Sequence, residues 1–243
     1  MISMDDRVVI ITGAGSGIGK AIAIECSKHY PIVCLIGRSL DKLELVAESA
    51  RKFCSKVYCY SVDLTFCADI KNIFIKINNQ WGHVDVLVHS AGIFSRGNVE
   101  YAPVDEFDRQ FFTNVRGPYY LTQLLLPLIR KKKGQIVFIN SSVGLTDGIA
   151  NISQYVATKQ ALKAIADSLR AEVNADGLRI ISVYPGRTAT PMQQAICQAE
   201  GKQYQPKIFS QPEDIAKIVL NALFVSRSSE VTDIVIRPMK KGK

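Results

Sequence analysis

The sequence lacks any apolar run long enough to cross a membrane. A spanning helix needs about 20 consecutive apolar residues, and the longest apolar stretch, 121–129, is interrupted by Thr122, Gln123 and Pro127. The first six residues carry two aspartates and no basic residue, whereas a secretory leader begins with a basic segment. We therefore expect no membrane association and a cytoplasmic location.

Metal ligands are also scarce. The 243 residues include three histidines and six cysteines, and no two cysteines form the C-x-x-C pair typical of zinc sites. Several of the cysteines lie in apolar runs. We therefore expect buried, reduced thiols and no bound metal.

The net charge of +8 comes from two clusters, 130–133 and 237–243, which contribute four positive charges each and leave the remainder neutral. The first cluster is expected at a helix C-terminus, where cations complement the helix dipole, and the second lies at the chain end. We therefore expect no nucleic-acid partner. An apolar fraction of 47% with 21% charged residues excludes disorder as the main state.

Short buried runs and helical periodicities alternate along the chain. Seven apolar runs predict strands, at 8–11, 32–36, 57–62, 84–88, 135–140, 178–184 and 231–236. Six amphipathic segments predict helices between them, at 17–30, 39–52, 69–81, 104–132, 153–176 and 210–225. Parallel strands need crossover helices, which cover both faces of a sheet. We predict a single doubly wound α/β domain over 1–243, with a seven-stranded parallel sheet and helices on both faces.

The segment 187–210 departs from this alternation. It is long for a connection in such a fold and contains Met192, Ile196 and Tyr204. We interpret it as a substrate loop or lid.

A glycine-rich turn follows the first predicted strand. Residues 12–19 read T-G-A-G-S-G-I-G and lead directly into the first predicted helix. This is where an open parallel sheet of the Rossmann type binds a dinucleotide, because glycines allow close backbone approach and the helix N-terminus presents free N–H groups to a pyrophosphate. The alternative is a tight turn that binds nothing. The residues expected to contact a dinucleotide here are Gly13, Gly15, Ser16, Gly17, Ile18 and Gly19.

The end of the second strand indicates which dinucleotide is bound. An acidic residue there bonds the ribose 2′-hydroxyl of NAD, but this chain has Gly37, Arg38 and Ser39. A guanidinium can pair with the 2′-phosphate of NADP. These residues favour NADP(H) over NAD(H). The alternative is that Arg38 is a solvated loop residue that contacts no cofactor.

Tyr155 and Lys159 are four residues apart in the predicted 153–176 helix, which places them on one face. The phenol has an ordinary pKa near 10, and a neighbouring ammonium favours the phenolate. Tyr155 is thus a candidate general acid or base for a carbonyl or alcohol group. Ser142, at the end of the fifth strand, is a candidate hydrogen-bond donor to the same oxygen. Ser141 is the alternative, and it should face the opposite side if the strand continues.

These motifs together resemble the short-chain dehydrogenase/reductase family, from Arg7 to about Ile236. The resemblance implies a catalytic tetrad of Asn114, Ser142, Tyr155 and Lys159, in which Lys159 also binds the nicotinamide ribose and Asn114 holds a water in a proton relay. Further cofactor contacts are implied at Asp63, Leu64, Ala91, Gly92, Pro185, Gly186, Thr188 and Thr190. The family also commonly pairs subunits through its two long helices, which implies a homodimer or homotetramer.

Two features depart from the family pattern. His89 and Ser90 stand where the family has two asparagines, and we interpret His89 as structural rather than catalytic. The last strand also lacks the glycine pair that many relatives carry, since it reads Ile234-Val235-Ile236-Arg237-Pro238. The second departure weakens any analogy to the ketoacyl reductases of fatty-acid synthesis.

We therefore expect an NADP(H)-dependent enzyme that transfers a hydride between the nicotinamide and a carbonyl or secondary alcohol. The alternatives are an NAD-dependent alcohol dehydrogenase and a non-catalytic NADP-sensing protein. The candidates for the substrate pocket are mainly apolar, namely Ile93, Phe94, Val143, Leu145, Ile149, Met192, Ile196 and Tyr204. They favour a largely neutral small molecule, and Arg96 and Arg187 leave a carboxylate-bearing substrate open.

Overall fold

The computed structural model describes residues 6–239, and the expected N-terminal acidic segment and the C-terminal lysines lie largely outside that range. Within it, seven parallel strands form one sheet in the order β3-β2-β1-β4-β5-β6-β7. The strands are β1 (Val8–Thr12), β2 (Ile32–Gly37), β3 (Lys56–Ser61), β4 (Val86–His89), β5 (Gln135–Ile139), β6 (Arg179–Pro185) and β7 (Asp233–Ile236). The predicted seven-stranded parallel sheet is confirmed.

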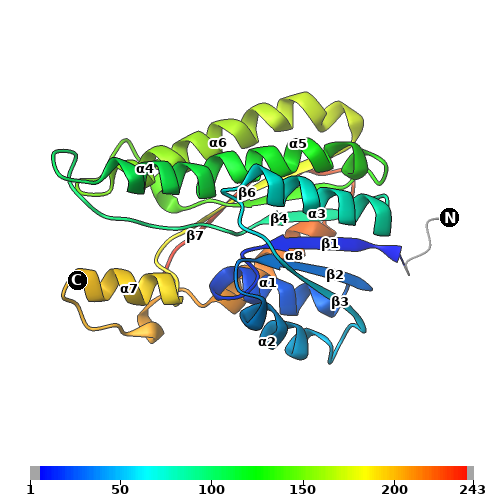
Figure 1. Ribbon diagram of the computed structural model, residues 1–243, viewed down its shortest axis with the longest axis horizontal. Helices are drawn as coiled ribbons and strands as arrows, with labels where there is room; N and C mark the ends of the chain where they lie inside the picture. Colours follow the sequence, from blue (N-terminus) through cyan, green and yellow to red (C-terminus); the bar gives the residue numbers. More distant parts are fainter. Residues whose placement is uncertain (1–5, 240–243) are drawn as a thin grey trace.

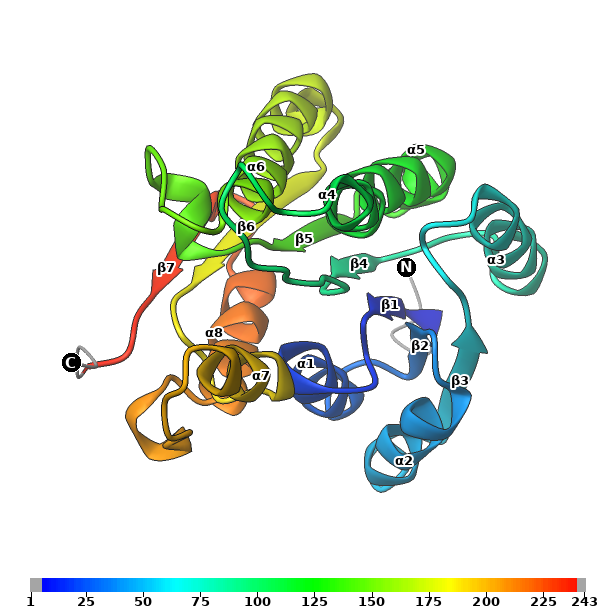
Figure 2. The same ribbon diagram turned by 60° about the vertical axis from the view of Figure 1, so that its left-hand side comes forward.

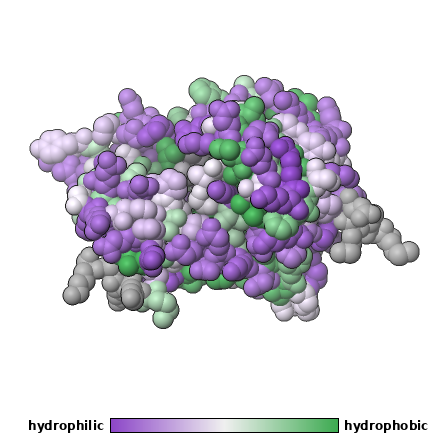
Figure 3. Space-filling model, turned by 90° about the horizontal axis from the view of Figure 1, so that it is seen from below, coloured by the Kyte–Doolittle hydropathy of each residue, from purple (hydrophilic) through white to green (hydrophobic). Residues whose placement is uncertain are grey.

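Helices cover both faces of this sheet, as Figures 1 and 2 show. One layer holds α1 (Gly17–Ser27), α2 (Leu40–Ala50) and α8 (Pro212–Phe224). The other holds α3 (Cys67–Gln80), α4 (Val104–Phe111), α5 (Gly117–Arg130) and α6 (Ser153–Val173). The lower face in Figure 1, seen directly in Figure 3, is mainly hydrophilic with scattered hydrophobic residues. The predicted doubly wound class is therefore confirmed.

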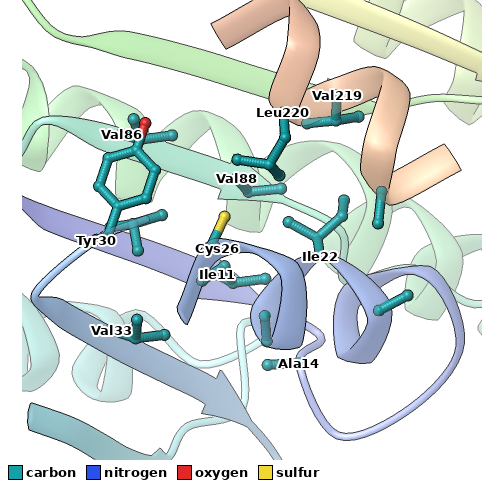
Figure 4. Packing of buried hydrophobic residues seen from close by; sticks show 14 of the residues in the cluster. Ile11, Ala14, Ile22, Cys26, Tyr30, Val33, Val86, Val88, Val219 and Leu220 are labelled. Carbon is teal, nitrogen blue, oxygen red and sulfur yellow. The ribbon is translucent and has the colours of Figure 1, made fainter. Parts of the chain in front are cut away.

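Alternate residues of the central strands enter two separate cores, because successive side chains of a strand point to opposite faces. Ile10 packs into the layer of α3, α5 and α6, whereas Ile11 packs into the layer of α1, α2 and α8. Figure 4 shows the second core, where Ile22 of α1 and Leu220 of α8 meet the sheet around Val88. All five residues of β1 are buried, as expected for a central parallel strand.

The helix predicted over 104–132 is interrupted at its middle. A π-helical turn, Phe112–Arg116, lies between α4 and α5. Such turns insert an extra residue and are frequent at functional sites. Here the turn contains the buried Asn114.

The segment 187–210 contains a helix that the sequence analysis missed. Helix α7 (Pro191–Ala199) begins after Thr190, whose hydroxyl accepts a hydrogen bond from the Gln193 amide at 3.2 Å. A bridge between Thr188 and Ser210 joins the two ends of the segment. Its motion as a lid stays a prediction.

None of the helices within the described residues has both the length and the hydropathy of a membrane span. In that same part of the chain, no three His, Cys, Asp or Glu side chains gather where they could hold a metal ion. All six cysteines are free thiols, and four of them are buried.

Candidate active site

A cleft of about 880 Å³ lies at the carboxyl ends of the strands. β1 and β4 are neighbours, and the chain continues outward from them in opposite directions, through β2 and β3 on one side and β5 to β7 on the other. Such a switch point is where open α/β sheets bind ligands. Most predicted site residues line the cleft, namely Gly13, Gly15, Ser16, Gly17, Ile18, Arg38, Ser39, Asp63, Leu64, Ala91, Gly92, Ser142, Tyr155, Lys159, Pro185, Gly186, Thr188 and Thr190. Gly19 and Asn114 are not among the lining residues.

The glycine-rich turn is built by close backbone approach. Gly13 has φ +66°, and a Cβ there would lie 2.6 Å from the Ala91 amide nitrogen. A Cβ on Gly19 would clash with the Gly13 carbonyl oxygen, so Gly19 allows α1 to pack closely against the turn. The turn therefore presents bare backbone and the N-terminus of α1 to the cleft, a cradle suited to an anion.

The segment after β4 is fixed without the asparagine pair of the family. The Thr12 hydroxyl accepts from the Ser90 and Ala91 amides at 3.1 and 3.3 Å. His89 points away from the cleft, stacks on Phe138 at 5.0 Å between ring centroids, and bonds the Thr122 hydroxyl at 2.8 Å. Burial lowers the pKa of His89 to about 3. These contacts support the structural interpretation of His89.

Two cations stand at the end of the cleft beyond β2. Arg38 and Lys42 both line it with exposed side chains, and neither makes an ion pair with another described residue. The Ser39 hydroxyl caps α2 by accepting from the Lys42 amide at 3.4 Å. Across from them, Asp63 Oδ1 accepts from the Thr65 amide and hydroxyl at 2.9 and 2.8 Å. Lys42 was missed by the sequence analysis, although its place in the first turn of the helix that follows Arg38 was a usable signal.

Tyr155 and Lys159 meet on one face of α6, as predicted. The Lys159 Nζ lies 5.7 Å from the centroid of the Tyr155 ring and donates to the Ile139 carbonyl at 3.2 Å. Lys159 is only 4% exposed. Gly92 lies next to this ammonium group, since a Cβ on Gly92 would be 3.8 Å from Lys159 Nζ.

Two serines after β5, Ser141 and Ser142, both line the cleft. The expectation that Ser141 faces away from Ser142 assumed that the strand continues, and this premise is wrong because β5 ends at Ile139 and a 3₁₀ turn begins at Ser142. The Ser141 hydroxyl accepts from the Val143 amide at 3.4 Å, and hydrogen bonding by Ser141 acts to lower the pKa of Tyr155. Ser142 as the donor to the substrate oxygen stays a prediction, with Ser141 as the alternative.

Burial has the largest effect on the pKa values of Tyr155 and Lys159. It raises the pKa of Tyr155 to about 12, with the Ser141 hydrogen bond acting in the opposite direction, and lowers the pKa of Lys159 to about 8. The sequence analysis expected the ammonium to lower the pKa of the phenol, but within this chain the loss of hydration is larger. At neutral pH the phenol is therefore a protonated group, able to donate.

Asn114 acts as a clamp between two elements. Its Oδ1 accepts from the Ile93 amide at 2.8 Å, and its Nδ2 donates to the Ile93 carbonyl at 2.9 Å and to the Thr158 hydroxyl at 3.1 Å. The Thr158 hydroxyl in turn donates to the Tyr155 carbonyl at 2.8 Å. The amide thus joins the segment after β4 to α6. Its part in a proton relay stays a prediction.

The other end of the cleft has an apolar wall. The Phe94 ring lies edge-on to Tyr155 at 5.0 Å between centroids. Val143, Ile149, Met192 and Ile196 also line the cleft, as expected of a substrate pocket, whereas the candidates Leu145 and Tyr204 are not among its lining residues. Arg96, Arg187 and Glu200 border it. The sequence analysis did not single out Glu200.

Fold and site together define a doubly wound α/β protein whose cleft holds a glycine-rich turn and a pair formed by the half-buried Tyr155 and the buried Lys159. A family model described as short chain dehydrogenase matches residues 7–201. The chain belongs to the short-chain dehydrogenase family, which confirms the resemblance, and it is an oxidoreductase of that family.

Known proteins match over almost the whole length. The chain is 29% identical to a sepiapterin reductase of Chlorobaculum tepidum, over 96% of each sequence. The structure of an alcohol dehydrogenase from Thermococcus sibiricus with 5-hydroxy-NADP matches with a TM-score of 0.87 and 26% identity, covering 98% of this chain and 99% of that one. A short chain dehydrogenase of Shigella flexneri with NADP matches with a TM-score of 0.86 and 28% identity, over 96% and 97%.

Proposed function

We propose that the protein is an NADP(H)-dependent oxidoreductase that interconverts a carbonyl and a secondary alcohol, with Tyr155 as the general acid and base. The observation that carries this is that Tyr155, Lys159 and Ser142 line the same cleft as a glycine-rich anion cradle, with Lys159 Nζ 5.7 Å from the centroid of the Tyr155 ring.

The residues present fit a dinucleotide. Gly13 leaves bare backbone where any side chain would clash, and the N-terminus of α1 favours a pyrophosphate. Asp63 and Leu64 would border the adenine, and Lys159 would bind the nicotinamide ribose. Pro185, Gly186, Thr188 and Thr190 would border the nicotinamide end. When bound, the dinucleotide supplies the hydride.

The chain itself supplies the proton and the setting. Tyr155 donates its phenolic proton to the carbonyl oxygen of the substrate, and its raised pKa keeps that proton in place at neutral pH. The Ser142 hydroxyl donates a hydrogen bond to the same oxygen as negative charge develops there, with Ser141 as the alternative donor. Lys159, still largely protonated at pH 7 with a pKa of about 8, stabilises the phenolate left behind. In the reverse direction the phenolate removes the proton of the alcohol.

The preference for NADP rests on the cations beyond β2. Arg38 and Lys42 both reach the cleft where a 2′-phosphate would lie, and no described acidic residue pairs with either. The bound NADP analogue and NADP of two related structures agree with this assignment. An NADH dissociation constant equal to or below that of NADPH would favour an NAD-dependent dehydrogenase instead.

Two further proposals follow from the family. A homodimer or homotetramer would use the helices α4, α5 and α6, and light scattering measures the assembly directly. We also propose that the chain forms one domain, that the enzyme is cytoplasmic and that residues 187–210 act as a lid. Limited proteolysis with and without NADPH tests the lid, because this segment should be cut faster in the protein without NADPH.

Turnover of NADPH with a panel of ketones, aldehydes, 3-oxo acids and 3-oxoacyl thioesters tests the proposed function. We expect at least one class to be reduced and Tyr155→Phe to abolish reduction while NADPH still binds, because the substitution removes only the proton donor. NADPH binding with no reduction of any class would support the alternative, a non-catalytic NADP sensor. Reduction that survives in Tyr155→Phe would contradict the role of the phenol.

A further inference from the structure

Three cations converge on one carboxylate at the substrate end of the cleft. Glu200, directly after α7, lies 3.0 Å from Arg96 Nη1, 3.6 Å from Arg187 Nη2 and 3.0 Å from Lys202 Nζ. Arg96 comes from the segment after β4 and Arg187 from the segment after β6, so the carboxylate joins two walls of the cleft. The group carries two positive charges in excess.

Glu200 is the covered member of this cluster. Its side chain is 16% exposed, against 40% for Arg96 and 45% for Arg187. A hydrogen bond from Lys202 and the charges of the two arginines hold the pKa of Glu200 below its ordinary value. The cluster therefore surrounds a carboxylate of the chain itself with three cations, at the border of the cleft.

The arginines retain most of their capacity to donate. A guanidinium has five N–H donors, yet Arg96 makes one hydrogen bond, to Glu200 Oε1 at 3.0 Å, among the described residues. Arg187 approaches Glu200 without a hydrogen bond in that same set. Arginine pairs well with carboxylates because its planar guanidinium donates two parallel N–H···O hydrogen bonds to the two carboxylate oxygens.

The cluster also adjoins the place of the reaction. Arg96 lies two residues after Phe94, whose ring packs against Tyr155. Arg187 directly follows Gly186 at the nicotinamide end of the cleft. A ligand with its carbonyl at Tyr155 and an apolar body along Phe94 and Ile196 would direct its far end toward the cluster.

We propose that the substrate of this enzyme is an oxo acid, whose carboxylate is bound by Arg96 and Arg187 in exchange for Glu200. The proposal rests on the proposed function and names its substrate class. Glu200 then holds the two arginines in position when the cleft is empty and competes with the substrate for them. Of the two substrate types that the sequence left open, the geometry points to the charged one.

Matched pairs of ketones test this most sharply: an oxo acid and its methyl ester, which differ in charge at one end. We expect the native enzyme to favour the acid over the ester by at least about tenfold in kcat/KM, the effect of losing one charged hydrogen bond. Arg96→Gln and Arg187→Gln should each reduce that ratio through a higher KM for the acid. Arg51→Gln is the matched control, because Arg51 pairs with one glutamate at 3.0 Å outside the cleft, and it should keep the native ratio.

Glu200→Gln should change the acid-to-ester ratio in the opposite direction to the two arginine substitutions. Removing the internal competitor should lower the KM for the acid by about threefold or more and increase the acid-to-ester ratio. A ratio near one in the native enzyme, or a Glu200→Gln variant that weakens acid and ester alike, would overturn the proposal and leave Glu200 as a structural clamp.

A failure of the proposed function can be distinguished from a failure of the carboxylate site. If no ketone is reduced, calorimetric titration of the same acids and esters into the NADPH-saturated protein decides the point. Tighter binding of the acid that is lost in Arg96→Gln supports the carboxylate site without any turnover, and equal binding of acid and ester refutes it.

Discussion

Replacing Ser141 and Ser142 one at a time separates two neighbouring hydroxyls that both line the cleft. Ser142, which begins the 3₁₀ turn after β5, is the donor that the family resemblance implies, and Ser141 directly precedes that turn. Loss of one donor to a developing oxyanion costs about 3–4 kcal/mol, or about 100- to 1000-fold in kcat. We therefore expect a loss of this size for Ser142→Ala and a change within about threefold for Ser141→Ala.

The comparison is informative because the two substitutions remove the same atom from adjacent residues. Ser141→Ala also removes the hydrogen bond that lowers the pKa of Tyr155. The pH at which the rate of alcohol oxidation rises should therefore move upward in that variant and stay in place in Ser142→Ala. NADPH dissociation constants, measured by calorimetry, should match the native value in both. A larger loss of kcat for Ser141→Ala than for Ser142→Ala would refute the reasoning and make Ser141 the donor.

Three further substitutions probe the fold and the cofactor site. Gly13→Ala places a methyl group against the Ala91 amide at a positive φ, and should cost at least about 2 kcal/mol of unfolding free energy in urea; a loss below about 0.5 kcal/mol would contradict the packing described. His89 stays neutral when folded, with a pKa of about 3, so the unfolded chain alone takes up a proton below about pH 6.5 and stability falls with pH from there toward pH 3. The urea midpoint of unfolding should therefore fall less between about pH 7 and pH 5 in His89→Asn than in the native protein. An equal fall in both proteins would contradict a contribution of His89 to the pH dependence of stability. The double variant Arg38→Gln/Lys42→Gln should weaken NADPH binding by about 10- to 100-fold and NADH binding by less than about threefold, and equal weakening of both would remove the phosphate assignment.

The sheet and the glycine-rich turn were predictable because short-range chemistry determines them. Runs such as 8–11 are apolar at every position, which only a strand covered on both faces requires. Gly13 and Gly19 stand where backbone must approach backbone within a few ångströms. The spacing of Tyr155 and Lys159 fixes their shared helix face in the same local way.

The errors arose where the geometry depends on residues distant in sequence. The π turn at Asn114 is stabilised by hydrogen bonds to Ile93 and Thr158, which no periodicity reveals. The expectation that Ser141 faces away from Ser142 failed because β5 ends at Ile139, before either serine. Glu200 gained its importance only when α7 brought it beside Arg96, across the cleft.

The high pKa of Tyr155 also lay beyond sequence reasoning. A charge four residues away is visible in a sequence, but the degree of burial that opposes it is not. The same burial lowers the pKa of Lys159, so the pair depends on the packing of α6 against β5.

Transfer of deuterium from NADPH labelled at the reactive carbon of its nicotinamide tests the central claim most directly. With the best ketone of the panel, mass spectrometry of the alcohol product should show one deuterium on the carbinol carbon for the native enzyme and no labelled alcohol for Tyr155→Phe. Alcohol formed without deuterium at that carbon would contradict hydride transfer in this cleft.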